Sequence, residues 1–152
     1  MTKEIIISTD HAGAKIKSKI EKALLELNIT YIDYSPENKS TDDYPDFAKE
    51  VGEEILNKKN TMGILACGTG IGMSIAANKL KGIRAALIHN KKEAELARKH
   101  NDANILILPG HYSSQKLTEQ QVKQIIKTFY ETKFEKGRHL RRVNKIKKLE
   151  KS

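Results

Sequence analysis

Short apolar runs alternate along the chain with longer segments in which apolar residues recur every three or four positions. Such runs are typical of strands buried on both faces, whereas the wider spacing is typical of helices with one apolar face. The sequence predicts five strands, at 5–9, 30–34, 62–66, 83–88 and 104–108. A helical segment is expected after each strand, as indicated by spaced pairs such as Ile16 and Ile20, Val51 and Ile55, and Val122 and Ile126.

This alternation predicts the fold class. Near-continuous apolar strands separated by helices indicate a parallel sheet with helices on both faces. We therefore expect an α/β fold, namely a single-domain three-layer α/β/α sandwich that is Rossmann-like and has a five-stranded parallel sheet. One domain over residues 1–152 is expected, because this length suits a single core and no linker or repeat divides it. A basic C-terminal helix is predicted at 138–150, with an apolar stripe that includes Val143 and Ile146.

Charge and composition limit the partners that this protein can have. The formal net charge is +9, and residues 133–152 hold nine Lys or Arg against two Glu, so the other residues are close to neutral. Phe134 is the one aromatic residue in that basic segment, which offers no stacking platform for nucleic acid. No apolar run approaches the roughly 20 residues of a membrane span, and the N-terminus does not resemble a signal peptide. We expect a soluble, cytoplasmic protein with no nucleic-acid or membrane partner.

Polar and glycine residues follow the first and third predicted strands. Asp10 and His11 follow the first, and Cys67 with the glycine-rich run 68–72 follows the third. Open parallel sheets bind ligands at the carboxyl ends of their strands, and these two strands are commonly neighbours where the strand order reverses. Alternating glycines let backbone amides point at a phosphate or a developing oxyanion. The run matches neither a P-loop nor the GxGxxG spacing, and a merely tight turn is the alternative.

Each candidate residue also has a purely structural reading. A lone cysteine is commonly a small buried hydrophobe, although neighbouring amides at a helix start favour a reactive thiolate at Cys67. Asp10 could simply cap the following helix, and His100 could simply end one. Arg138 and Arg142 lie one turn apart and could hold a phosphate, or could belong to a basic surface helix. A single cysteine excludes an internal disulfide, and no metal-ligand spacing recurs, so neither a metal nor another cofactor is expected.

Taken together, the motifs resemble the type B ribose-5-phosphate isomerases of the ribose/galactose isomerase family. The resemblance covers nearly the whole chain, and five motifs occur in the family's order. They are Ser8-Thr9-Asp10-His11-Ala12-Gly13, Asp43-Tyr44-Pro45, the run 67–79 that begins Cys67-Gly68-Thr69-Gly70-Ile71-Gly72, His100-Asn101-Asp102, and Gly137-Arg138-His139 with Arg142.

The resemblance implies an aldose–ketose isomerase that interconverts ribose 5-phosphate and ribulose 5-phosphate in the pentose phosphate pathway. Cys67 would move a proton between C2 and C1 through a cis-enediolate. Some relatives lack the cysteine and have a glutamate base where Met73 stands here, so the resemblance implies that Cys67 is the base in this chain. The other implied roles fall into four groups. They are oxyanion stabilisation by the amides of Gly68, Gly70, Ile71 and Gly72; ring opening by His100 with Asp10 and Thr69 near the sugar; phosphate binding by His11, Arg138 and Arg142; and sugar contacts from Asn101 and Tyr44.

The resemblance also implies a homodimer or dimer of dimers with shared active sites, in which His100 and Asn101 reach the neighbouring subunit. One departure concerns His111, which stands where relatives usually carry arginine and which we expect to bind substrate. Isomerases of six-carbon sugar phosphates, such as allose 6-phosphate or galactose 6-phosphate, therefore remain an alternative. A non-catalytic protein that binds sugar phosphate or nucleic acid is the alternative from another class.

Overall fold

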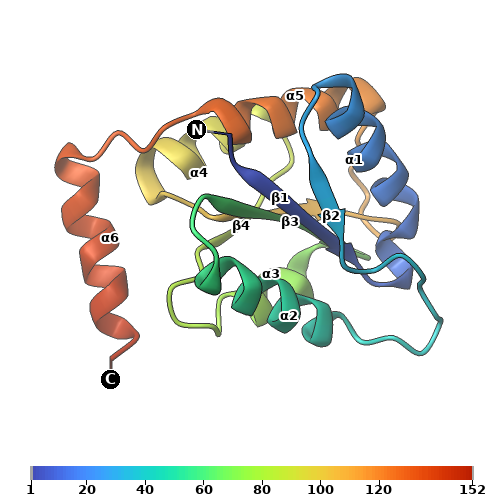
Figure 1. Ribbon diagram of the computed structural model, residues 1–152, viewed down its shortest axis with the longest axis horizontal. Coiled ribbons are helices and arrows are strands. Elements are labelled where there is room, and N and C mark those ends of the chain that lie inside the picture. The colour runs from blue at the N-terminus through green and yellow to red at the C-terminus, as the bar shows by residue number, and fades with distance from the viewer. Residues whose placement is uncertain (1, 152) are drawn as a thin grey trace.

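Five parallel strands form one sheet at the centre of the molecule (Figure 1). The structure is a computed structural model that describes residues 2–151. The strands are ordered β2-β1-β3-β5-β4. Their bounds are β1 Glu4–Thr9, β2 Tyr31–Asp33, β3 Thr61–Cys67, β4 Ala85–Leu87 and β5 Ile105–Pro109. The predicted parallel sheet is confirmed, as is the expected pairing of the first and third strands.

Helices cover both faces of the sheet, which confirms the predicted three-layer sandwich. On one face α1, α4 and α5 pack into a single apolar cluster, and on the other face α2 and α3 pack into a second. The helix bounds are η1 His11–Gly13, α1 Ala14–Glu26, α2 Tyr44–Asn57, α3 Ile71–Ala77, α4 Lys91–Asn101, α5 Glu119–Glu131 and α6 Gly137–Leu149. No helix within residues 2–151 is long and apolar enough to cross a membrane.

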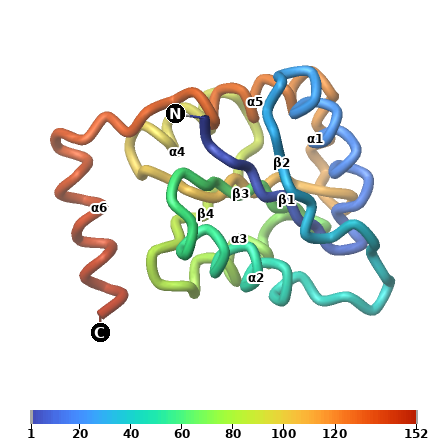
Figure 2. The backbone as a smooth tube through the Cα atoms, in the orientation of Figure 1, coloured from blue at the N-terminus to red at the C-terminus, as the bar shows by residue number. Residues whose placement is uncertain are grey.

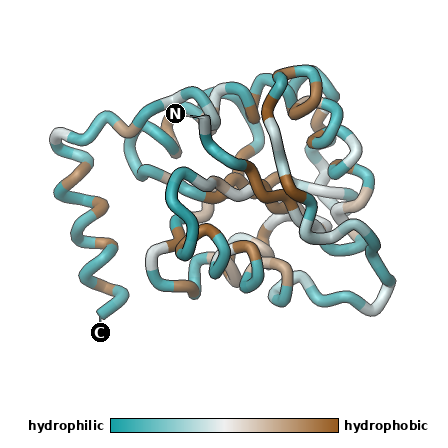
Figure 3. Tube along the Cα trace, in the orientation of Figure 1, coloured by the Kyte–Doolittle hydropathy of each residue, from teal (hydrophilic) through white to brown (hydrophobic). Residues whose placement is uncertain are grey.

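The strands divide their side chains between the two apolar clusters, as the two-residue period of a strand requires. In β1, Ile5 and Ile7 belong to the cluster under α1 and α5, whereas Ile6 belongs to the cluster under α2 and α3. In β3, Leu65 and Cys67 join the second cluster in the same way. The most apolar stretches of the chain therefore gather in the middle layer (Figure 3). Cys67 ends its strand on the α2–α3 side.

The fourth strand is shorter than the sequence predicts. The apolar run 83–88 contains only three ladder residues, and β4 is an edge strand that pairs with β5 alone. Ile83 and Ile88 are nevertheless buried. The apolar pattern therefore predicted burial correctly but overestimated the length of the strand. The helix expected after the third strand is present as α3, which begins at Ile71, directly after Gly70.

The last helix is set apart from the rest of the chain. In Figure 2, α6 stands beside the β4 edge of the sheet and reaches the body through the end near α4. Most of its residues are exposed, and His139 and Val143 are the buried ones. The helix confirms the predicted C-terminal element, whose apolar stripe is only partly covered.

Candidate active site

Three loops meet at the carboxyl end of β3. The loops follow β1, β3 and β5, and Gly110 in the last of them lies so close that a Cβ there would overlap the carbonyl oxygen of Cys67. The backbone N–H of His111 donates to the carbonyl of Ala12 at 3.2 Å, and the N–H of Tyr112 donates to the carbonyl of Gly68 at 2.8 Å. Backbone contacts thus fix the segments that carry Asp10, Cys67 and His111 against one another.

Cys67 is the last residue of β3, and its free thiol side chain is 4% exposed. The turn that follows contains Gly70 at φ +80°, a left-handed conformation that glycine adopts without strain. Within this turn the N–H of Ile71 donates to Thr69 Oγ1 at 3.2 Å. The amides of the first helical turn have no partner inside a helix, so those of α3 that follow Ile71 can face an anionic oxygen beside the thiol.

Two tyrosine rings lie against this turn. A Cβ placed on Gly72 would come within 2.6 Å of Tyr44 Cζ, and a Cβ on Gly68 would overlap the ring of Tyr112. Tyr44 was expected to line the site, and it does contact the turn. Tyr112 was missed, because a single aromatic residue in a polar loop gives no periodic signal.

Asp10 lies at the end of β1 and is 5% exposed. Its Oδ1 accepts a hydrogen bond from the N–H of Gly13 at 3.0 Å, so the capping role considered for this residue is confirmed. Burial raises the pKa of the carboxyl group, although the hydrogen bond from Gly13 acts in the opposite direction. A raised pKa suits a carboxyl group that exchanges protons with a hydroxyl.

His11 is held by Asp42, a residue that the sequence analysis did not select. Asp42 Oδ1 accepts from His11 Nδ1 at 2.7 Å and from its backbone N–H at 3.0 Å. Asp42 Oδ2 accepts from Asn38 Nδ2 and from the N–H of Lys39, each at 3.0 Å. The carboxylate therefore orients the imidazole and leaves its Nε2 to face a ligand.

The same contacts shift two pKa values in opposite directions. Burial alone would raise the pKa of Asp42, but the hydrogen bonds from His11, Asn38 and Lys39 lower it to about 2. The hydrogen bond to Asp42 in turn raises the pKa of His11. This pair favours a positively charged imidazole, which is the form that attracts a phosphate.

The remaining predicted residues lie elsewhere. His100 and Asn101 end α4, which leads into the amino end of β5, whereas Cys67 lies at the carboxyl end of β3. Because β3 and β5 are parallel, these two groups occupy opposite edges of the sheet. His100 and Asn101 lie at the edge formed by the amino ends of the strands, and Cys67 lies at the edge formed by their carboxyl ends. Arg138 and Arg142 are exposed on α6, which packs against α4. One chain therefore holds two separate groups of candidate residues.

The loop after α4 is firmly anchored. Asp102 adopts a left-handed conformation at φ +48°, and its carboxylate accepts from Arg98 at 3.0 Å and from Arg84 at 3.1 Å. Arg98 is 7% exposed. Since Asp102 follows directly after His100 and Asn101, these ion pairs fix the end of the helix that presents both side chains.

Two triads bring potential metal ligands close together, although the sequence spacing showed neither. Asp10, His11 and Asp42 form one triad, and His100, Glu135 and His139 form the other, with ligand atoms within 4.8 Å of one another. In the first, His11 and Asp42 already form a hydrogen bond. In the second, the two histidine rings stack on each other. Each triad thus contains a direct contact between two of its own side chains.

Comparison with known proteins places the chain in a family. The model of the Ribose/Galactose Isomerase family matches residues 5–146. The chain belongs to this family. It is 36% identical to ribose-5-phosphate isomerase B of Escherichia coli over 148 residues, covering 97% of both proteins.

Solved structures of the family share the fold over nearly the full length of the chain. A ribose 5-phosphate isomerase of Thermotoga maritima is 44% identical, with a TM-score of 0.89 over 97% of this chain and 99% of that one. Ribose-5-phosphate isomerase B of Mycoplasma genitalium, solved with bound ribulose 5-phosphate, is 40% identical, with a TM-score of 0.88 over 100% and 99%. The expected family and fold are thereby confirmed.

Proposed function

We propose that this member of the ribose/galactose isomerase family interconverts ribose 5-phosphate and ribulose 5-phosphate by way of a cis-enediolate. The main support is the position of the single thiol, since Cys67 ends β3 where three loops meet and a glycine-rich turn begins. Relatives with the same fold over nearly their whole length carry the name ribose-5-phosphate isomerase B. We expect the reaction to take place in the cytoplasm, without a metal or other cofactor.

Proton transfer is the proposed task of Cys67. As a thiolate it takes the proton from C2 of the open-chain aldose, and the electron pair of that C–H bond forms the enediolate. The amides of the 68–72 turn stabilise the negative oxygen as it develops. The hydroxyl proton on O2 then passes to O1, and the thiol returns the carbon-bound proton to C1, which yields the ketose and restores the thiolate. Asp10 and Thr69 lie on the adjoining loops, where they can contact the sugar hydroxyls.

The phosphate end of the substrate requires positive charge. His11 supplies it beside the thiol, because Asp42 holds the imidazole and favours its protonated form. Arg138 and Arg142 lie one helical turn apart and can bind the same phosphate through two guanidinium groups. They belong, however, to the group of residues at the other edge of the sheet.

A second copy of the chain would complete the site. Cys67, Asp10 and His11 lie at the carboxyl edge of the sheet, whereas His100, Asn101 and the two arginines lie at the amino edge or on α6. A homodimer with shared active sites would place the second group of one subunit against the first group of the other.

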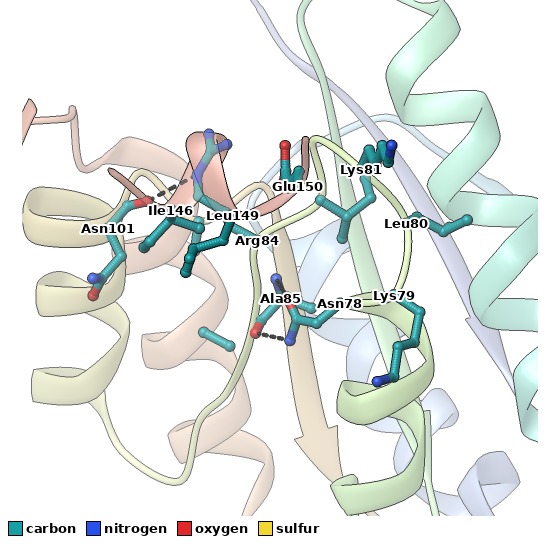
Figure 4. A pocket seen from close by; sticks show the side chains of 13 residues that line it. Asn78, Lys79, Leu80, Lys81, Arg84, Ala85, Asn101, Ile146, Leu149 and Glu150 are labelled. Carbon is teal, nitrogen blue, oxygen red and sulfur yellow. Dashed lines mark hydrogen bonds between the residues drawn. The ribbon is translucent and has the colours of Figure 1, made fainter. Parts of the chain in front are cut away.

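The surface around α6 also supports this assembly. A cavity of about 760 Å³ lies between α6 and the segment 78–86, and Figure 4 shows Ile146 and Leu149 facing it together with Asn101. Leu140 and Ile146 are 42% and 39% exposed. An incompletely covered apolar stripe is typical of a surface that another subunit contacts.

Mixing two inactive variants tests the shared site. We expect Cys67→Ala and His100→Ala each to be inactive alone, and their mixture to regain activity after subunit exchange, because a mixed dimer contains one intact site. A mixture of Cys67→Ala and Asp10→Ala is the matched control, since both changes affect the same group of residues. Equal activity in both mixtures would contradict the shared site.

Deuterium incorporation tests the reaction itself. Wild-type protein incubated with ribose 5-phosphate in deuterated water should form ribulose 5-phosphate and introduce solvent label, as a proton transfer through an enediolate requires. Comparing kcat/KM for five-carbon and six-carbon substrates decides the preferred sugar, which is the point left open by His111. A large preference for allose 6-phosphate or galactose 6-phosphate would replace our choice of substrate.

A further inference from the structure

His139 is buried on a helix that is otherwise mostly exposed. Its side chain is 3% exposed, whereas its neighbours Arg138 and Leu140 face solvent. The imidazole lies flat against that of His100, with ring centroids 4.0 Å apart and an angle of 14° between the planes. Among residues 2–151, His139 Nε2 has no hydrogen-bond partner. The ring contact with His100 is therefore a specific interaction of this side chain, and a carboxylate oxygen of Glu135 lies within 4.8 Å of a nitrogen of each ring.

The backbone before His139 is held against the end of α4. The N–H of Glu135 donates to the carbonyl of Lys99 at 3.1 Å, one residue before His100. Lys136 and Gly137 follow at φ +62° and +48°, and a lysine is rarely found in such a conformation. The N–H of His139 then donates to the carbonyl of Lys136 at 2.9 Å. An unfavourable turn in this position directs His139 onto His100.

The surroundings of His139 favour the neutral form of its ring. Burial lowers the pKa of His139, Coulombic interactions with His100, Arg138 and Arg142 act in the same direction, and the interaction with Glu135 opposes them. A neutral aromatic ring can stack on His100 whether or not His100 carries a proton. The contact therefore persists while His100 takes up and releases a proton.

We propose that His139 is a positioning residue, which holds the imidazole of His100 in the orientation that reaches the sugar ring. The inference rests on the proposed function, in which His100 opens the furanose and Arg138 and Arg142 bind the phosphate. His139 lies on the same helix as both arginines, and its ring contact joins that helix to the end of α4. Phosphate binding and ring opening are thereby aligned by one rigid unit of the same subunit.

This role predicts a specific kinetic defect. His139 contacts His100 but has no assigned contact with the substrate, so loss of its ring should lower kcat for the step that needs His100 and leave KM nearly unchanged. A misoriented catalytic group commonly lowers a rate by about 10- to 100-fold. Proton transfer by Cys67 should be unaffected, because Cys67 acts on the open-chain sugar after the ring has opened.

Two apolar replacements separate positioning from chemistry. His139→Phe keeps a flat ring and has no nitrogen, whereas His139→Leu fills the space without a flat ring. Net conversion of ribose 5-phosphate requires ring opening. Solvent-deuterium exchange at C1 of ribulose 5-phosphate does not, because its C5 oxygen carries the phosphate and cannot close a furanose. Measuring both reactions for each variant, together with thermal unfolding, isolates the ring-opening step.

We expect His139→Phe to retain the wild-type ratio of conversion to exchange, and His139→Leu to lower that ratio by about 10-fold or more at unchanged KM. A wild-type ratio in His139→Leu would overturn the positioning role, since burial alone would then suffice. A lowered ratio in His139→Phe would also overturn it, since a ring nitrogen would then be required. If even the wild-type protein performed neither reaction, the proposed function itself would fail, and this inference with it.

Discussion

Asp42→Asn tests how the phosphate-binding end of the site is built. The substitution keeps the size of the side chain but removes the negative charge that accepts hydrogen bonds from His11, Asn38 and Lys39. A fall in the pKa of Asp42 from 3.8 to about 2 corresponds to about 2 kcal/mol favouring the charged form in the folded protein. Because water screens a carboxylate near the surface, we expect about 1 kcal/mol of this to appear as stability.

The sign of the pH dependence follows from the direction of the shift. A carboxyl group whose pKa is lowered by folding stabilises the protein above its unfolded pKa of 3.8, and this contribution is lost as the pH falls towards 2. The difference in unfolding free energy between wild type and Asp42→Asn should therefore be present at pH 6 and shrink between pH 4 and pH 2. Urea unfolding at several pH values measures it.

The same substitution should weaken phosphate binding near neutral pH. The hydrogen bond to Asp42 is the main cause of the raised pKa of His11, so in the variant His11 should lose its proton at a lower pH. Competitive inhibition by inorganic phosphate, followed from pH 5 to pH 8, should then weaken at lower pH than in wild type. Asp43→Asn is the matched control, since it removes the same charge from the next residue, whose contribution to the raised pKa of His11 is smaller than the hydrogen bond to Asp42. Identical inhibition profiles for wild type and Asp42→Asn would refute this account of His11.

Other substitutions test separate parts of the structure. Cys67→Ser should abolish isomerisation while phosphate binding persists, and unchanged turnover would remove the assigned base. His100→Asn should impair conversion of ribose 5-phosphate more than deuterium exchange into ribulose 5-phosphate, and equal losses would leave His100 only a binding role. Gly110→Ala should lower both stability, by about 1–3 kcal/mol, and activity, because the new methyl group overlaps the carbonyl of Cys67. Phe129→Ala should lower stability by about 3–5 kcal/mol in thermal unfolding, with kcat retained in the folded fraction.

The fold could be predicted from the sequence, because apolar residues recur with the same period as the buried positions of a strand or helix. Ile5 and Ile7 face one apolar cluster and Ile6 the other, as a strand period of two requires. A run that is apolar at every position therefore belongs to a strand buried on both faces. The length of β4 could not be predicted in the same way, because Ile83 and Ile88 are buried without belonging to the hydrogen-bonded ladder. Apolar residues report contact with the core, and whether they also lie in a strand depends on which neighbours are within reach.

Only part of the candidate site could be predicted from the sequence. Residues that directly follow strands, such as Asp10 and Cys67, could be placed together because a parallel sheet brings those ends to one edge. Asp42 and His139 were not predicted as parts of the site. Asp42 forms a hydrogen bond with His11, which is distant in the sequence, and His139 stacks on His100, which lies on another helix. Such supporting contacts depend on loop conformation, which the apolar pattern does not determine.

The topology also separates Cys67 from His100 within one subunit. In a parallel sheet, a residue that follows a strand and a residue that ends a helix leading into a strand lie at opposite edges, whatever their spacing in the sequence. Cys67 is of the first kind and His100 of the second, so no movement of a single loop could bring them together. If both act on one sugar, His100 must come from another copy. Subunit contact would then be a condition of catalysis, and we expect specific activity to fall when dilution separates the subunits.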